Sequence, residues 1–327
     1  MNAMFGAAPL SFDRDGADWP NRDASRFVEA GGLRWHVQRM GAGPQMLMIH
    51  GTGAATHSWE ALLPRLAARF DVLAPDLPGH GFTRSKRAPD LSLPGIARAT
   101  TALTRSQDFR PKVVVGHSAG AAILARMCLD GAIAPDLFIS LNGAWLPFEG
   151  AAQVLFPSMA KLLFLNPLAP RLFAWSADRT SVRKLLAGTG STIGERGVEL
   201  YTRLFGNPVH VASALGMMAN WSLTELAREL PKLKPRMLLI VGAGDKAVSP
   251  KISATVAGRI PGAMVEIIPA AGHLVHEEKP DAVAELIFAY AASVEAGSRA
   301  DPGSGGRNVR ARAGPRPSGS DRVLSIR

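Results

Sequence analysis

The chain has 327 residues, of which 47% are hydrophobic, and this composition excludes a disordered protein and allows a large buried core. The net charge is +10, but residues 296–327 carry half of it, with seven Arg and two Asp. No basic stripe interleaved with aromatic side chains occurs elsewhere, so nucleic-acid binding is not expected.

The first half of the chain reads as alternating strands and helices. Residues 1–24 have the composition of a loose N-terminal leader, and Gly31-Gly32 further on is a hairpin signal between two β-type runs. The runs VVVG and LFISL are continuously apolar, which is typical of parallel strands buried on both faces. The elements predicted here are strands at 25–30, 33–40, 45–50, 70–75, 112–116 and 137–141, and helices at 93–106 and 119–130.

The alternation stops at residue 147. Residues 147–232 show helical apolar patterns broken by Pro and Gly, and no convincing strand. A helical block inserted between two strands of one sheet predicts a lid over the carboxyl edge, where α/β proteins bind ligands. Beyond the block, strands are predicted at 236–241 and 264–268, and helices at 250–259 and 281–292.

These patterns predict an α/β protein with a mostly parallel eight-stranded sheet and helices on both of its faces. The tail is rich in Gly, Ser, Arg and Pro, so it cannot bury enough surface to offset its ordering entropy and is predicted to be disordered. The predicted parts are a leader at 1–24, a core at 25–146 and 233–295, a helical lid at 147–232 and a basic tail at 296–327.

The strongest local motif is Gly-His-Ser-Ala-Gly at residues 116–120, between a predicted strand and a predicted helix. In that context Gly-x-Ser-x-Gly places the serine on a sharp, strained turn with its hydroxyl exposed at the edge of the sheet. Side chains at Gly116 and Gly120 would collide with the neighbouring strand and helix. Ser118 is therefore the predicted nucleophile; a plain turn serine is the alternative.

A serine hydroxyl needs a general base, and the base needs a carboxylate that fixes its tautomer. His273 lies just beyond the last predicted strand, and Asp245 follows the strand before it. The order Ser, Asp, His is that of the α/β-hydrolase fold. His276 is an alternative base. Asn142 occupies the other position from which this fold takes its acid, and an amide there favours Asp245.

Two backbone amides are expected to hold the oxyanion. The residue after the nucleophile, Ala119, supplies one N–H, and the loop after the third strand supplies the other, from Thr52 or else from Gly53. We expect His50 to brace that loop and Asp76 to cap backbone amides in a turn. No histidine spacing typical of a metal site occurs, so neither a metal nor a cofactor is predicted.

The predicted lid is dense in Phe, Met and Trp, which favours an apolar ligand over a sugar or a charged metabolite. Ordinary helix packing accounts for part of this pattern. The lid is also suited to a peripheral contact with a bilayer surface. The residues predicted to contact substrate are Phe156, Phe164, Met217, Met218 and Trp221.

The cellular location is predicted from what the chain lacks. Cys128 is the single cysteine, so no intramolecular disulfide forms, as expected in a reducing compartment. The N-terminus has no basic segment followed by an apolar stretch, and no run of about 18 uncharged apolar residues predicts a membrane helix. We therefore expect a cytoplasmic enzyme.

Several segments carry a resemblance to known families. The general α/β-hydrolase pattern is matched over about residues 25–292 by HGTGAATHSW, APDLPGHGFT, VVGHSAGAA, GDKAVSP and AGHLVHEEKP. The leader DGADWPNRDASRFVEAGGLRWHVQ, the stretch SLNGAWLPFEG and the lid segments LAGTGS and HVASALGMMANW resemble the BchO family of magnesium-chelatase accessory proteins. This resemblance implies a role in bacteriochlorophyll biosynthesis, near magnesium insertion into protoporphyrin, with a tetrapyrrole as ligand and the chelatase as partner.

Two functions stay open at this stage. One is a serine hydrolase that cleaves an ester or acyl bond of a hydrophobic, tetrapyrrole-like substrate; the other is a non-catalytic porphyrin-binding accessory protein that kept the triad. Haloalkane dehalogenases and epoxide hydrolases use an aspartate as nucleophile, so Ser118 disfavours both. Lyase or C–C hydrolase chemistry stays open, because such enzymes keep all three triad residues.

Overall fold

The computed structural model describes residues 8–147, 166 and 168–300. Within this part, eight strands follow one another in the order β1-β2-β4-β3-β6-β7-β8-β9, and the two-residue β5 pairs with β2 as a ninth. Neighbours from β4 to β9 are parallel, whereas β2 is antiparallel to β1, β4 and β5. The predicted mostly parallel sheet is therefore confirmed. The strands are β1 (Ser25–Ala30), β2 (Leu33–Met40), β3 (Gln45–Ile49), β4 (Asp71–Pro75), β5 (Arg84–Ser85), β6 (Val113–His117), β7 (Leu137–Leu141), β8 (Arg236–Gly242) and β9 (Met264–Ile268).

The helices also follow the predicted order along the chain, and most ends agree to within two residues. Short 3-10 turns, labelled η, join some of them. The helical segments are α2 (Phe12–Asp15), η1 (Arg22–Ala24), η2 (Thr56–Trp59), α3 (Leu62–Leu66), α4 (Leu93–Ser106), α5 (Ala119–Leu129), α7 (Ala169–Ser176), α8 (Arg179–Gly188), α9 (Glu195–Phe205), α10 (Pro208–Ala219), α11 (Thr224–Glu229), η3 (Leu230–Lys232), α12 (Pro250–Ala257), α13 (Val275–Glu278) and α14 (Pro280–Ala300).

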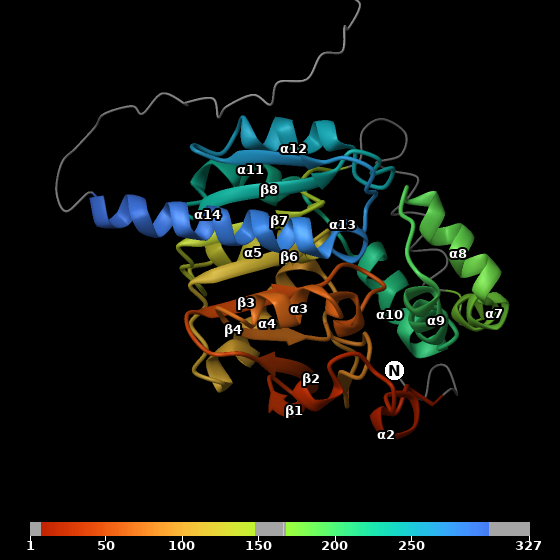
Figure 1. Ribbon diagram of the computed structural model, residues 1–327. Coiled ribbons are helices and arrows are strands. Elements are labelled where there is room, and N and C mark those ends of the chain that lie inside the picture. The colour runs from red at the N-terminus through yellow and green to blue at the C-terminus, as the bar shows by residue number, and fades with distance from the viewer. Residues whose placement is uncertain (1–7, 148–165, 167, 301–327) are drawn as a thin grey trace, which may run out of the picture.

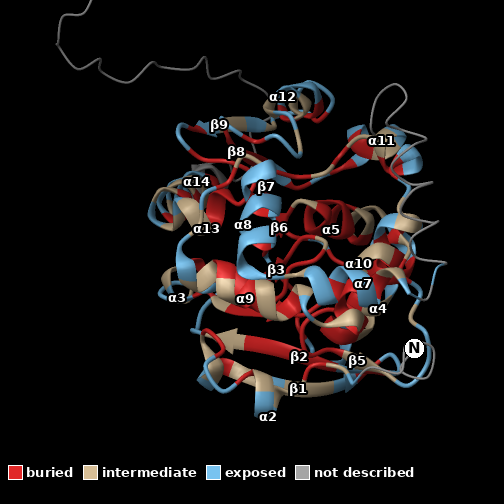
Figure 2. Ribbon diagram, turned by 90° about the vertical axis from the view of Figure 1, so that its right-hand side faces the viewer, coloured by how far each residue is buried: buried red, intermediate tan, exposed pale blue. Residues whose placement is uncertain are grey.

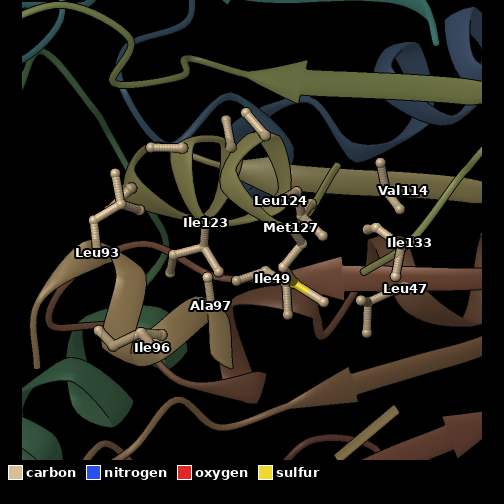
Figure 3. Close-up of a cluster of buried hydrophobic side chains, with 14 of the residues drawn as sticks. Leu47, Ile49, Leu93, Ile96, Ala97, Val114, Ile123, Leu124, Met127 and Ile133 are labelled. Carbon is tan, nitrogen blue, oxygen red and sulfur yellow. The ribbon is translucent and has the colours of Figure 1, made fainter. Parts of the chain in front are cut away.

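Helices cover both faces of the sheet because alternate residues of each buried strand point to opposite sides. In β3, Leu47 and Ile49 pack under α4 and α5, whereas Met46 and Met48 pack under α3 and α14. Figure 3 shows the first of these clusters, where side chains of α4 and α5 meet those of β3 and β6. Two apolar layers therefore bury both faces of the sheet. The carboxyl ends of the strands are where the candidate site residues lie.

The predicted hairpin at Gly31-Gly32 is present. Ala30 pairs with Leu33 across the turn, and the two glycines have φ of 59° and 78°. Positive φ at both central residues is the requirement of a tight two-residue hairpin turn, and glycine meets it without steric cost.

Helices α7 to α10 come from the inserted block and gather at one end of the sheet (Figure 1). Viewed from that end, they lie in front of the strands (Figure 2). Two of these helices have side-chain N-caps. Asp178 caps α8 by accepting from the Ser181 amide, and Asn207 caps α10 by accepting from the amides of Val209 and His210. Further along the block, α11 packs against α5 of the core. The lid boundaries of 147–232 stay a prediction.

The expectation of a loose leader is wrong for residues 8–24. Trp19 is 2% exposed, donates from Nε1 to the Thr56 hydroxyl over 3.0 Å and stacks edge-on against Phe82. Asp18 accepts from Arg196 and Arg203 of α9, each over 2.6 Å. These arginines hold the pKa of Asp18 below its usual value. The leader therefore joins the core to the inserted helices.

The carboxyl end of the core also differs from its predicted boundary. Helix α14 continues to Ala300, past the predicted end of the core at residue 295. Residues 296–300 of the predicted disordered tail are therefore helical, and the rest of that tail, residues 301–327, lies outside the described residues.

Replacing Trp19 tests how strongly the leader is anchored. We expect Trp19→Ala to lower the free energy of unfolding by about 3 kcal/mol, because it removes a buried indole and its hydrogen bond. Trp175→Ala is the matched control, since Trp175 is 88% exposed, and we expect a change under about 0.5 kcal/mol. Urea denaturation followed by circular dichroism measures both; equal effects of the two substitutions would contradict the anchoring.

Candidate active site

Ser118 occupies the turn between β6 and α5, with φ 52° and ψ −118°. A positive φ is strained for a residue with a side chain, and the strain is typical of a nucleophile on a strand-to-helix turn. A Cβ added at Gly116 would lie 2.5 Å from the Ala121 amide nitrogen, and one at Gly120 would overlap the Ile49 carbonyl oxygen. The two glycines are required by close backbone contact, as the sequence predicts.

Asp245 and His273 are hydrogen-bonded. Asp245 follows β8 and His273 follows β9, and the His273 Nδ1 donates to the Asp245 Oδ2 over 2.9 Å. The other carboxylate oxygen accepts from the amides of Ala247 and Val248, over 2.8 and 2.9 Å. Both side chains are buried, with residue exposures of 6% and 8%. The carboxylate is thereby fixed, and it holds the imidazole with Nε2 free to take a proton.

Asn142 is a partner of this pair that sequence reasoning missed. It follows β7, has φ 47°, and donates from Nδ2 to the same Asp245 oxygen that accepts from His273. The sequence identified Asn142 only as an amide where an acid could stand. Because β7 and β8 are parallel neighbours, their carboxyl ends meet at one edge, and that placement was the available signal.

The loop that carries His273 lies against the turn that carries Ser118. The His117 ring donates from Nε2 to the His273 carbonyl over 2.9 Å, and the two imidazole centroids are 4.9 Å apart. Within the described residues the Ser118 hydroxyl makes no hydrogen bond, so the contact from Ser118 to His273 stays a prediction. Such bonds are often long in enzymes without substrate.

The alternative base, His276, has a different environment. It is 0% exposed and packs between Trp59 and His117, with centroid distances of 4.6 and 4.4 Å. Neither of its ring nitrogens has a hydrogen-bond partner in the described part of the chain. The carboxylate contact therefore favours His273 as the base.

The two predicted oxyanion donors flank the nucleophile. A Cβ built on Gly51 would lie 3.1 Å from the Ser118 Cβ, so the loop that carries Thr52 runs directly beside the serine. Considering only the residues that are described, neither the Thr52 amide nor the Ala119 amide has an acceptor. Two free donors beside the nucleophile are what an oxyanion hole requires.

Comparison with known proteins agrees with this geometry. Residues 46–286 match the model of the alpha/beta hydrolase family. The magnesium-chelatase 30 kDa subunit of Rhodobacter capsulatus is 38% identical over 275 residues, which cover 83% of this chain and 96% of that relative. The chain belongs to the alpha/beta hydrolase family, in the BchO group of that subunit.

Solved structures of other proteins share the fold. The epoxide hydrolase CorEH aligns with a TM-score of 0.71 at 20% identity, covering 83% of this chain and 99% of that one. A thermophilic esterase from Thermogutta terrifontis aligns with a TM-score of 0.67 at 20% identity, covering 83% and 98%. At such identities the likeness concerns the architecture alone.

His210 links the inserted helix α10 to the loop after β3, residues 50–53, which carries the predicted oxyanion donor Thr52. This loop is called the oxyanion loop below. Its Nδ1 accepts from the Gly81 amide over 3.2 Å, so Nε2 carries the proton and donates to the Gly53 carbonyl over 3.0 Å. Burial lowers the pKa of His210 to about 4, which keeps this tautomer neutral at pH 7. Sequence reasoning missed His210, since nothing in the chain order pairs α10 with the loop after β3.

The predicted substrate-contacting residues differ in how far they are buried and in what they contact. Met217 is 0% exposed and its sulfur accepts from the Thr52 hydroxyl over 3.4 Å, so it lies at the oxyanion loop. Met218 is 45% exposed, and Trp221 is half-buried against the core. Phe156 and Phe164 lie outside the described residues. Met217 is therefore the described residue of this set that contacts the Thr52 loop, and its contact with substrate stays a prediction.

His50 braces the oxyanion loop, as the sequence predicts. Its Nδ1 donates to the Gly51 carbonyl over 2.8 Å, and its Nε2 accepts from the Leu77 amide over 2.9 Å. With both nitrogens engaged by backbone, this ring has no free electron pair for a metal.

Asp76 caps backbone amides, also as predicted. Its carboxylate accepts from the Thr56 and Phe82 amides, over 2.7 and 2.8 Å, and from His36 over 2.8 Å. Burial alone would raise its pKa, but His36 and these amides hold the pKa of Asp76 below its usual value. No cluster of three or more metal-ligating side chains occurs among the residues described, nor does any helix there have the length and apolarity to cross a membrane.

Glu277 is a buried acid that stays protonated at neutral pH. Its side chain is 11% exposed and accepts from the Tyr201 hydroxyl over 2.8 Å. Burial raises the pKa of Glu277 to about 8, whereas burial lowers the pKa of His276, 3.8 Å away, to about 3. Both groups are therefore neutral at pH 7, and their contact is not an ion pair.

Glu277→Gln tests this protonation. The folded-state pKa is above the unfolded value of 4.5, so the carboxyl's contribution to stability is complete below pH 4.5 and is lost as the pH rises through about 8. The amide keeps the Tyr201 bond without ionising. We expect Glu277→Gln to become more stable relative to the wild type across that window, by on the order of 3 kcal/mol at its upper end.

Urea denaturation at several pH values measures this difference. Glu225→Gln is the matched control, because it removes the same carboxyl group from an exposed position on α11. For Glu277→Gln, a difference that stays constant with pH would show that Glu277 titrates normally in the folded protein.

Proposed function

We propose that this protein is a serine hydrolase of bacteriochlorophyll biosynthesis that cleaves an ester or acyl bond of a hydrophobic substrate. The observation that carries the proposal is the 2.9 Å bond from His273 to Asp245, beside a strained nucleophile turn at Ser118. A buried imidazole held by a fixed carboxylate is the arrangement that activates a serine hydroxyl.

In the first step, the Ser118 oxygen attacks the acyl carbon and its proton passes to the His273 Nε2. The Asp245 carboxylate stabilises the imidazolium through the Nδ1 hydrogen bond. The amides of Thr52 and Ala119 donate to the negative oxygen of the tetrahedral intermediate. The intermediate expels the alcohol, which takes the proton from His273, and leaves an acyl group on Ser118.

In the second step, water replaces the alcohol. His273 takes a proton from water as the oxygen attacks the acyl carbon, and the same two amides hold the new oxyanion. Collapse of this intermediate returns the proton to the Ser118 oxygen. The products are a carboxylic acid and the free enzyme, so no cofactor is consumed.

The substrate is proposed to be apolar and tetrapyrrole-like. Met217 is fully buried directly behind the Thr52 loop, so the layer under that side of the site is soft and apolar, which supports an apolar substrate. The relative at 38% identity is named a magnesium-chelatase subunit, which supports a place near magnesium insertion into protoporphyrin and the chelatase as a partner.

We propose a cytoplasmic location with peripheral contact to the photosynthetic membrane. Helix α7 carries Leu172 and Trp175, which are 62% and 88% exposed, and such side chains suit the interface of a bilayer. This contact would place the inserted helices at the membrane surface, and hydrophobic pigments partition into the membrane.

A second function, a non-catalytic porphyrin-binding accessory protein, is favoured by one observation. Taking the described residues alone, the Ser118 hydroxyl is not bonded to His273, as a retained but unused triad would allow. In that case Met217 and Trp221 would contact a porphyrin and no bond would be cleaved.

Active-site labelling tests the hydrolase. We expect a fluorophosphonate to label the wild type, Ser118→Ala to abolish labelling, and His273→Ala to slow it about a thousandfold by removing the general base. Ser106→Ala, which removes a hydroxyl bonded within α4, is the control and should label at the wild-type rate. A folded wild type that resists labelling would refute the hydrolase.

Complementation separates the two functions. In a strain without the native protein, we expect Ser118→Ala to leave bacteriochlorophyll synthesis blocked and a porphyrin intermediate accumulated, because covalent catalysis needs the hydroxyl. Mass spectrometry of the pigments identifies that intermediate. Normal bacteriochlorophyll with folded Ser118→Ala would favour the accessory function instead.

A further inference from the structure

The short segment Thr189–Thr192, between α8 and α9, contacts both loops that carry the proposed acid and base. It is called the clamp below. Its first three residues end the segment LAGTGS, one of those that resemble the BchO family. In the structure, α8 and α9 reach the sheet's edge at this point (Figure 1).

The clamp holds the acid loop through backbone contacts. The Lys246 amide donates to the Thr189 carbonyl over 3.0 Å, one residue beyond Asp245. Gly190 has φ +86°, and a Cβ added there would overlap the Gly244 carbonyl oxygen. The clamp therefore approaches the acid loop so closely that only glycine fits.

The clamp holds the base loop through a buried side chain. The Ser191 hydroxyl oxygen accepts from the Leu274 amide over 2.8 Å, one residue beyond His273, and Ser191 is 3% exposed. A Cβ added at Gly272 would overlap the Gly190 carbonyl oxygen. The clamp is thus wedged between the residues that flank the proposed catalytic pair.

Glu278 completes the connection. One of its carboxylate oxygens accepts from the Gly272 amide over 2.9 Å, and the other accepts from the Thr192 amide over 3.0 Å. A cavity of about 420 Å³ borders these groups and is lined by residues of the clamp and of both loops, Glu278 included.

We propose that Ser191, with the clamp around it, is a positioning residue that keeps the acid loop and the base loop at the separation the Asp245–His273 bond requires. The inserted helices then form part of the catalytic scaffold as well as a cover. A bond of 2.9 Å between two loops is sensitive to sub-ångström shifts, and a lateral brace on both loops limits them. This inference rests on the proposed hydrolase function.

The experiment compares Ser191→Ala with Ser181→Ala. Ser181 is an exposed serine of the same insertion, and its contact is the Asp178 cap of α8. We expect Ser191→Ala to lower kcat for a fluorogenic ester about tenfold or more with KM nearly unchanged, and to slow fluorophosphonate labelling to the same extent. Ser191→Thr keeps the acceptor oxygen and should recover most of the rate. Ser181→Ala should match the wild type.

A second readout does not depend on activity. The proton shared by His273 and Asp245 gives a downfield proton NMR signal, assigned by its loss in His273→Gln. We expect Ser191→Ala to shift or broaden that signal and Ser181→Ala to leave it in place. Glu278→Gln, which weakens the same junction by a smaller change, serves if Ser191→Ala does not fold.

The outcomes separate the two proposals. Wild-type kinetics and an unshifted signal in folded Ser191→Ala would overturn the positioning role while the hydrolase stands. An inert wild type whose signal shifts in Ser191→Ala would overturn the hydrolase and keep the clamp as the brace of the pair. An inert wild type with an unshifted signal would overturn both.

Discussion

The hydrogen bond between the His273 ring and the Asp245 carboxylate is the interaction on which the site depends. Both residues stand on loops that leave adjacent parallel strands, β8 and β9, so the sheet brings them to one edge. The carboxylate then receives Asn142 and the amides of Ala247 and Val248. Such a fixed acceptor costs little reorganisation when the imidazole becomes charged, which is the physical basis of catalysis by preorganised groups.

The core was predictable because its patterns are local. Continuous apolar runs mark β6 and β7, and glycines on either side of Ser118 mark a crowded turn, so each element could be recognised from its own residues. Chain order then paired Asp245 with His273. The partners that no local pattern marks were not predictable: Asn142 depends on which strands are neighbours, and His210 depends on how an inserted helix docks.

The leader, residues 8–24, is a second case in which contacts with distant residues were not predictable from the local sequence. Its residues 13–24 are rich in Asp and Arg and read as loose chain, yet the Trp19 indole and Leu10 pack in a cluster with Phe82 and Leu200. Asp18 adds two arginine contacts from α9. Apolar side chains and the Asp18 carboxylate dock this short segment because the receiving surface exists, and that surface is assembled from residues far along the chain.

The inserted helices meet the core at the loops that would perform the chemistry. Ser191 reaches the base loop, His210 reaches the oxyanion loop, and Met217 reaches Thr52. All three belong to the two insertion segments that resemble the BchO family, LAGTGS and HVASALGMMANW. A lid that only covered substrate could be free of such contacts. Under the proposed function, a movement of the insertion would also displace the loops that carry the acid–base pair or the oxyanion donor, because these three contacts join them.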